Sequence, residues 1–597
     1  MQSLNWYARR LRAMGPAEIA GRCRTALRTP LDRFLLPRRQ RPHMASSLVR
    51  ADAKFEGAFR VSDMPVGAWS AAEPGSVEAG WRDRLTVRAD AIAAHRLSYF
   101  DLEDHHHGDP IDWNRDHKAG IAAPMEFSPS IDYRDIQVTG DCKFVWEPNR
   151  HQHLVVLGRA YRATGNSRYA EAVAEQLESW LDQCPYGVGM NWRSPLELGV
   201  RLINWVWALE LIRESGVIAG TLRTRLLESA ALHVWEIARN YSRGSSANNH
   251  LIGEAAGVWV AAGYFDGLAD AARYRKEAGA ILQDEIFKQT FEDGGGREQA
   301  FGYQVFVIQF FLIAGLVARK RGEDFPKSYW DRLELMLEFV AAMLEGGARL
   351  PMVGDADDGY VLDLDNDPVD PRGWLCIGAE VFGREDWADI AGTGDEAVTW
   401  LCDTASGGNQ RPAQAGVRLE SRAFPQSGYY LLQSGRRHER DRISIVFDCG
   451  SLGYGPLAAH GHADALSFTL RAFGEDVLVD PGTYDYFSYP EWRAYFRSTR
   501  AHNTIVIDDL DQSEVSGLFL WERKARARCI EWAPSEGGGR IVAEHDGYTR
   551  LSDPVVHRRT LELDGPAGLI TIRDEIVAHE EHDTAIYFHL AETCRWT

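Results

Sequence analysis

The chain has 597 residues, too many for one ordinary hydrophobic core, so roughly two to four domains are expected. Hydrophobic residues make up 45% and charged residues 25%, proportions typical of a globular protein and not of a disordered or fibrous one. The net charge of -20 excludes general nucleic-acid binding, and eight scattered cysteines without a CxxC pair support neither a zinc finger nor a disulfide framework.

Residues 1–45 form a basic arm on an otherwise acidic chain, with ten arginines against Glu18 and Asp32 in its first 41 residues. These arginines interrupt every apolar run, so the arm lacks a signal-peptide pattern, and no run of about 18 apolar residues predicts a spanning helix. Either the arm lies peripherally on an anionic membrane or partner, or it packs on its own body with its arginines in solvent. We expect a cytoplasmic or membrane-peripheral protein, with a periplasmic location and a homodimer both left open.

From about residue 146 to residue 345, apolar residues recur at intervals of three and four, the period of helices. Roughly eight helices follow one another, including one with a start signal at Ser194 and a stop at Gly216. Their lengths indicate helical hairpins stacked into a toroid or solenoid. We expect a helical domain over 46–400, joined to the next domain by the weakly periodic, Gly- and Asp-rich stretch 371–416.

After about Val417 the sequence pattern changes to short segments of alternating apolar and polar residues, separated by Gly, Asp and Pro. Segments such as "SGYYLLQSG", "RISIVFDCG" and "GLITIRDEIVA" predict strands, and their regular spacing predicts an antiparallel sandwich over 401–597. The sequence stops inside the strand-like segment "YFHLAETCRWT". Whether the sandwich has all of its last strands is therefore left open.

Two polar clusters lie at the starts of predicted helices. "SSANNHLIGE" places Asn249, His250 and Glu254 at the opening of an apolar helix; asparagine there is often only a cap, but an imidazole beside the amides indicates more. "DGGGREQAFGYQVFV" places Glu298 and Tyr303 after a glycine run that lacks the P-loop spacing. A tyrosine in such a helix is usually a core residue. For both clusters the alternative to a functional site is therefore a purely structural role, as a helix cap or as part of the core.

The segment "NWRSPLELGVRLINW" opens with Asn191 and Trp192 and places Glu197, Arg201 and Trp205 at intervals of four. The ordinary interpretation is an intrahelical ion pair between the glutamate and the arginine. The alternative is a groove wall that offers carboxylate, guanidinium and indole groups to a sugar chain, and we expect Asn191, Trp192 and Arg201 to bind the substrate.

The segment "AAHGHADALSFTL" contains His460 and His462, with Asp480 18 residues after the second histidine and His502 22 residues further on. Two imidazoles and a carboxylate from separate strands are a ligand set typical of zinc with one place open for water. Histidines at strand ends are also common without a metal, and the pair could instead handle a proton.

Seven segments in this order resemble the heparinase II/III-like polysaccharide lyases and related alginate lyases: "WEPNRHQHL", "NWRSPLELGVRLINW", "NNHLIGE", "REQAFGYQVFV", "HGHADALSF", "LVDPGTY" and "YFRSTRAHNT". The resemblance implies an α+β multidomain protein, an incomplete (α/α) toroid followed by a C-terminal antiparallel β-sandwich, with the groove between them. It also implies that Asn249 neutralises a uronate carboxylate beside His250, and that Tyr303 and His460 transfer the protons.

The resemblance further implies that His462, Asp480 and His502 hold a structural divalent metal, which we expect to be zinc, and that Glu254 and Tyr495 lie near the substrate. No organic cofactor is expected. Two residues apart on a regular strand, His460 and His462 would share a face, so their different roles require an irregular turn at Gly461.

We therefore expect a lyase that cleaves an acidic, uronate-containing polysaccharide by β-elimination. Glycosaminoglycan-like, alginate-like and bacterial exopolysaccharide substrates all remain open. A glycoside hydrolase on the same toroid is the alternative, with its two carboxylates drawn from Glu197, Glu254 and Glu298. A polysaccharide-binding or assembly protein without turnover is the third hypothesis, although a binder needs no proton-transfer set.

Overall fold

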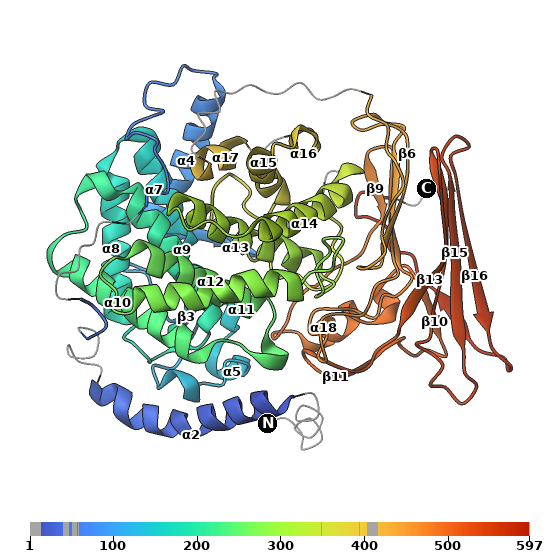
Figure 1. Cartoon of the computed structure of the whole chain (residues 1–597), viewed down its shortest axis with the longest axis horizontal. Helices are drawn as coiled ribbons and strands as arrows, with labels where there is room; N and C mark the ends of the chain where they lie inside the picture. Colours follow the sequence, from blue (N-terminus) through green and yellow to red (C-terminus); the bar gives the residue numbers. More distant parts are fainter. Residues whose placement is uncertain are drawn as a thin grey trace.

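The computed structural model describes residues 14–39, 47–50, 57, 59–347, 349–392, 395–402 and 416–595. Helices gather on one side of the molecule and antiparallel sheets on the other (Figure 1), which confirms the expected fold class. The helices are α2 (Pro16–Arg39), α4 (Val77–Ala93), α5 (Ile136–Thr139), α6 (Cys142–Asn149), α7 (Gln152–Thr164), α8 (Ser167–Gln183), α9 (Pro195–Leu211), α10 (Gly220–Asn240), α11 (Asn249–Tyr264), α12 (Ala271–Lys288), α13 (Phe301–Lys320), α14 (Lys327–Glu345), α15 (Pro371–Phe382), α16 (Glu385–Ala391), α17 (Asp395–Leu401) and α18 (Pro490–Phe496).

Two antiparallel sheets form the sandwich, a five-stranded sheet in the order β5-β6-β7-β8-β9 and a four-stranded sheet in the order β13-β14-β15-β16. Side chains such as Leu432, Ile445, Ile541 and Leu561 fill the space between them. The strands are β1 (Arg96–Tyr99), β2 (Leu102–His106), β3 (Arg115–Asp116), β4 (Ile121–Ala122), β5 (Arg422–Phe424), β6 (Tyr429–Ser434), β7 (Ile443–Asp448), β8 (Phe468–Ala472), β9 (Glu475–Leu478), β10 (Ile505–Ile507), β11 (Glu514–Gly517), β12 (Leu520–Arg523), β13 (Ala527–Ser535), β14 (Gly538–His545), β15 (Val556–Asp564), β16 (Leu569–Val577) and β17 (Thr584–Ile586).

The eight helices α7 to α14 cover the stretch where the sequence predicted about eight. Helices α9, α11 and α13 are buried along almost their whole length, and apolar residues predominate around each of them. Helices α8, α10, α12 and α14 alternate with them and keep a polar face toward solvent. This alternation of inner and outer helices is the arrangement of an α/α toroid.

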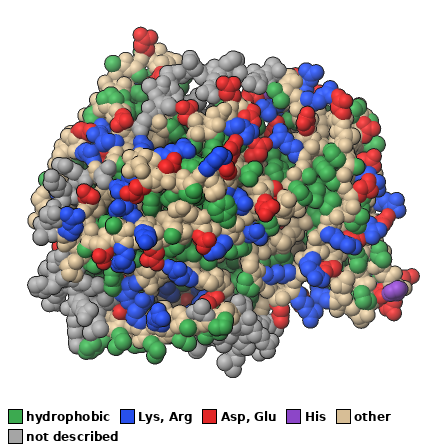
Figure 2. Space-filling view, viewed as in Figure 1, with side chains coloured by type: hydrophobic (Ala, Val, Ile, Leu, Met, Phe, Trp, Pro, Cys, Tyr) green, Lys and Arg blue, Asp and Glu red, His purple; other side chains and the backbone are tan. Residues whose placement is uncertain are grey.

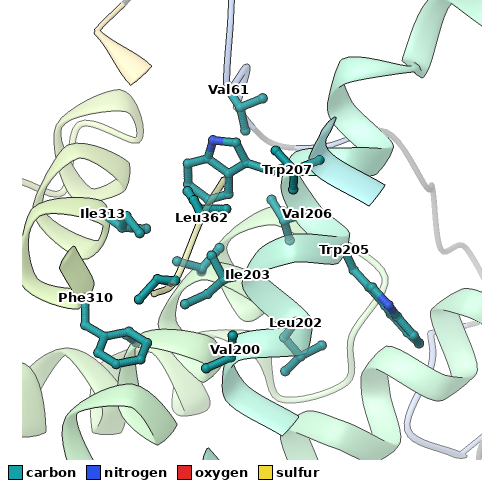
Figure 3. Close-up of a cluster of buried hydrophobic side chains, with 14 of the residues drawn as sticks. Val61, Val200, Leu202, Ile203, Trp205, Val206, Trp207, Phe310, Ile313 and Leu362 are labelled. Atoms are coloured by element: carbon teal, nitrogen blue, oxygen red, sulfur yellow. The ribbon is translucent and has the colours of Figure 1, made fainter. Parts of the chain in front are cut away.

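Helix α13 is the one described helix long and apolar enough to cross a membrane by length and composition, but 89% of its most apolar window is buried inside the protein. Its neighbours supply the apolar surroundings. Figure 3 shows Ile203 and Trp207 of α9 near Phe310 and Ile313 of α13. We therefore assign α13 to the core.

Helices α9 and α11 approach closely through glycines. A Cβ atom on Gly257 would lie 2.4 Å from the Cα atom of Gly199, and one on Gly199 would lie 2.6 Å from the carbonyl oxygen of Gly253. Because backbone cannot move aside as a side-chain tip can, this crossing requires the absence of side chains at these positions.

Two expectations about the connections are corrected. The stretch after Pro371 does not lack regular structure, because it folds into α15, α16 and α17 before residues 403–415, which lie outside the described ranges. In the N-terminal arm, of which residues 1–13 and 40–45 lie outside the described ranges, α2 packs on its own body as one of the two alternatives expected. The contact is made through Glu18, Arg22 and Arg28, so the arginine face is not simply in solvent. The division at residue 400 itself stays a prediction.

An apolar contact joins the helical part to the sandwich. Phe301 of α13 and Phe339 of α14 pack against Tyr429 and Leu431 of β6. The two parts thus share a small core, and the segments beside this core are held in fixed positions relative to one another.

We predict that Gly257→Val destabilises the helical part, because the new side chain would force α9 and α11 apart at a cost of about 2 kcal/mol or more. Thermal unfolding followed by circular dichroism should show a lower midpoint. Gly80→Ala is the control, since its Cβ atom would meet only the flexible tip of Arg84 at 3.5 Å. An unchanged midpoint for the valine variant would show that the crossing is not tightly packed.

Candidate active site

A pocket of about 390 Å³ opens at the junction of the helical part and the sandwich. Its wall combines side chains from both parts and from the N-terminal helix: Arg22, Arg134, His250, Glu298, His460 and Phe519. Two imidazoles, a carboxylate, two guanidinium groups and an aromatic ring therefore meet in one cavity, which suits an anionic, ring-shaped ligand.

His460 is held in one orientation by a buried carboxylate. Its Nδ1 lies 3.1 Å from Oδ2 of Asp355, and its Nε2 lies 3.8 Å from Oε1 of Glu298. Burial acts to lower the pKa of His460, but the hydrogen bond to Asp355 and the charge of Glu298 raise it above its ordinary value. The imidazole thus presents Nε2 to the pocket and carries its proton more readily than a free histidine.

Asp355 is fully buried and connects four partners. Besides His460, its carboxylate lies 2.9 Å from Nε2 of His462, accepts a hydrogen bond of 2.9 Å from Thr483, and binds both Nη atoms of Arg493 on α18. Burial alone would raise the pKa of Asp355, but the Arg493 guanidinium and the histidines hold it well below its ordinary value. Asp355 is therefore an anion in the folded protein.

Tyr303 is the third residue of α13. Its ring stacks on the imidazole of His460, with ring centroids 4.0 Å apart. Its hydroxyl lies 3.1 Å from the hydroxyl of Tyr486. Burial, and then the nearby carboxylates Asp357 and Asp355, raise the pKa of Tyr303 well above its ordinary value. In the unloaded protein this tyrosine keeps its proton at neutral pH.

Asn249 and His250 are the first two residues of α11, and Asn248 caps the helix by accepting a hydrogen bond from the His250 backbone. The Asn249 amide donates to both oxygens of Glu298, at 3.2 and 3.1 Å. Burial and the neighbouring His460 lower the pKa of His250 to about 4, so this imidazole is neutral at pH 7. The positive end of the α11 dipole points into the same region and favours a bound anion.

The segment 458–467 is irregular, and strand β8 begins at Phe468. A Cβ atom on Gly461 would lie 1.5 Å from a backbone carbonyl oxygen of the preceding loop, so the turn requires glycine. This turn lets His460 line the pocket while His462 points into the interior.

His462, Asp480 and His502 gather in the interior, with one potential ligand atom from each within 4.8 Å of the others. His502 Nδ1 lies 2.9 Å from the Asp480 carboxylate. Within the part of the chain that the structure describes, Nδ1 of His462 and Nε2 of His502 are buried without a hydrogen-bond partner. Orphaned buried imidazole nitrogens beside a carboxylate fit a bound cation, which would satisfy both atoms.

Three residues predicted to contact the substrate lie in the core instead. Arg201 is fully buried, and its guanidinium donates to the backbone oxygens of Asn149 and Asn191. The Asn191 amide bonds to core neighbours, and the Trp192 indole donates to the Cys184 carbonyl oxygen at 3.1 Å. The interval of four had placed Arg201 correctly on a helix but did not reveal that this face is internal.

The remaining predicted contacts are also corrected. Glu254 is buried and accepts two hydrogen bonds of 2.7 Å from Ser242, a pocket residue, so it supports the wall from behind. Tyr495 lies on α18 against Trp492, outside the pocket. Glu197 pairs with Arg150 at 2.7 Å and not with the arginine four residues later. Of the three glutamates considered for a hydrolase, only Glu298 reaches the pocket.

Several residues of the site were not predicted from the sequence. Asp355 lies in "PMVGDADDGY", where an acidic residue between glycines was a signal that could have been followed. Arg493 and Tyr486 come from the region around α18. Arg22 reaches the pocket from the N-terminal arm, which periodicity could not place.

A helical toroid, an antiparallel sandwich and a pocket between them that is lined by histidine and arginine side chains define a class of carbohydrate-active protein. The chain belongs to the heparinase II/III-like family: "Heparinase II/III N-terminus" matches residues 84–365 and "Heparinase II/III-like, C-terminal" matches residues 416–597. The resemblance expected from the sequence segments is thereby confirmed.

The chain is similar to several characterised proteins. The heparin-sulfate lyase of Bacteroides stercoris is 24% identical over 499 residues, covering 79% of this chain and 67% of that protein. The alginate lyase of Stenotrophomonas maltophilia is 23% identical over 489 residues, covering 74% of this chain and 62% of that protein. The crystal structure of heparinase III superposes with a TM-score of 0.64 at 18% identity, covering 88% of this chain and 75% of that one. The chain spans between 52% and 67% of the length of the heparin-sulfate lyases of Bacteroides stercoris and Pedobacter heparinus.

We predict that Asp355→Asn destabilises the protein by about 3–5 kcal/mol, because it leaves the buried Arg493 charge without its counterion. Chemical denaturation should show this loss, and the double variant Asp355→Asn, Arg493→Met should recover part of it. Asp104→Asn, which breaks an exposed pair with Arg96, is the matched control and should leave stability unchanged. Equal stability of the single variant and the wild type would contradict the buried ion pair.

Proposed function

We propose that the protein is a polysaccharide lyase that cleaves an acidic, uronate-containing chain by β-elimination. The observation that carries the proposal is the meeting of His250, His460 and Glu298 in one pocket, with Tyr303 stacked behind His460. Arg22 and Arg134 add positive charge to the same wall and suit the carboxylates of neighbouring sugars. The relatives named as heparin-sulfate and alginate lyases support this class of reaction.

The carboxylate of the reacting uronate lies, in this proposal, at the N-terminus of α11. Removal of the C5 proton builds negative charge on that carboxylate, which hydrogen-bond donors and the helix dipole stabilise. His250 is neutral at pH 7 and donates one N–H there, while Asn249 positions Glu298 beside His460. Approach of the substrate anion would raise the pKa of His250 and strengthen this contact.

Tyr303 and His460 transfer the protons. A base takes the C5 proton, the C4–C5 double bond forms, the bond from C4 to the glycosidic oxygen breaks, and an acid protonates the leaving oxygen. The raised pKa of Tyr303 keeps the proton on its hydroxyl at neutral pH, so a proton for the leaving oxygen is present there before the reaction. Asp355 fixes the His460 tautomer so that Nε2 faces the pocket, and the uronate epimer decides whether His460 or Tyr303 serves as the base.

The interior triad holds, we propose, a divalent metal, with zinc favoured by the two imidazole ligands. His462, Asp480 and His502 would be its ligands. His462 also contacts Asp355, so a metal there would brace the carboxylate that orients His460. The proposed role is structural, and no proton transfer depends on it.

We predict that Tyr303→Phe and His460→Ala each lower kcat/KM by at least about 100-fold. The assay follows the ultraviolet absorbance of unsaturated uronate on heparan-type, chondroitin-type, hyaluronan, alginate and bacterial acidic polysaccharides. Tyr495→Phe, the same substitution outside the pocket, should retain the wild-type rate. Normal rates in both site variants would refute the proton-transfer roles, and new reducing ends without the absorbance would indicate a hydrolase instead.

Metal analysis tests the triad separately. We expect purified protein to carry one divalent ion per chain, His502→Ala to lose it, and chelation to lower the midpoint of thermal unfolding. His438→Ala removes an exposed histidine that faces Asp389 and should keep the full metal content. Absence of bound metal from wild-type protein, prepared without chelator, would exclude the proposed site.

A further inference from the structure

Helix α2 turns its polar side toward the protein. Oε1 of Glu18 accepts a hydrogen bond of 2.6 Å from the Ser245 hydroxyl, and Arg22 donates to Ser246 at 2.9 Å. Further along, Arg28 and Asp32 contact the end of α10 through ion pairs and hydrogen bonds. The helix is therefore fixed on the body by charged groups, the reverse of an ordinary surface helix.

The apolar side of α2 faces outward. Leu27 is 75% exposed, Leu31 60% and Phe34 58%, and Ala20 and Cys23 continue the same row at intervals of three and four. Figure 2 shows hydrophobic side chains along the lower edge of the molecule, where α2 lies in Figure 1, with Lys and Arg side chains directly above them. A continuous apolar row on a helix that is already anchored by its polar side marks an interaction surface.

The charged residues around the apolar row of α2 indicate which kind of partner binds there. Arg24 and Arg33 are exposed on α2, and the first 41 residues hold ten arginines against two acidic residues on a chain with a net charge of -20. A second copy meeting the first through this face would bring the same arginines together, because symmetric dimer contacts pair a patch with itself. An anionic lipid surface attracts them and accepts the apolar row among its acyl chains.

We propose that α2 docks the protein in the plane of an anionic phospholipid membrane, with Leu27, Leu31 and Phe34 inserted and Arg24 and Arg33 on the lipid phosphates. The polar side of the helix then faces the protein body. Arg22 on that side also lines the pocket, so the docked molecule holds its pocket next to the lipid surface. Docking does not depend on the reaction in the pocket.

Vesicle flotation of the full chain tests the proposal. Wild-type protein should float with vesicles of equal parts phosphatidylglycerol and phosphatidylcholine, and salt should weaken binding. The double variant Leu27→Glu, Leu31→Glu should bind at least about tenfold more weakly, and Arg24→Gln, Arg33→Gln should lose most of the salt dependence. Because these side chains point outward, the thermal midpoints should not change.

Val87→Glu is the matched control, since Val87 is 72% exposed on α4, at the opposite edge of Figure 1. It should bind vesicles as the wild type does. Equal binding to pure phosphatidylcholine vesicles, or undiminished binding by the double glutamate variant, would overturn the proposal. Light scattering that finds a dimer in solution, split by the same glutamates, would assign this face to a second copy instead.

Discussion

The Asp355 carboxylate is the interaction on which the site depends. It lies between α14 and α15 of the helical part, and its partners His460, His462 and Arg493 come from the sandwich side. A buried anion of this kind is stable only when several donors surround it, and here those donors exist only when the two parts are assembled. The contact that joins the helical part to the sandwich therefore also orients the imidazoles of His460 and His462.

The two oxygens of this carboxylate serve different regions. Oδ2 faces His460, which lines the pocket, and Oδ1 faces His462, which belongs to the interior triad. The glycine turn at Gly461 makes this division possible, because it separates two histidines that a regular strand would hold on one face. A change at the triad can thus alter the pocket through a single buried group.

The sequence predicted what periodicity and local signals encode, and little of what depends on distant contacts. Apolar spacing identified the eight helices and most strands, and the resemblance named His460 and the triad. Periodicity could not tell that Arg201 faces the core, nor that Glu197 would pair with Arg150 from 47 residues away. Asp355 was missed because a loop has no period, and only the fold shows which of the neighbouring aspartates meets His460, His462 and Arg493.

The location of the pocket follows from the toroid itself. Helices α11 and α13 are buried along their length, so their first turns are where they can offer polar groups to a ligand. Asn249 and His250 begin α11, and Glu298 and Tyr303 flank the start of α13. These turns meet the irregular loop that carries His460. Apolar inner helices thus confine the chemistry to the junction, while the N-terminal helix reaches the same junction through Arg22.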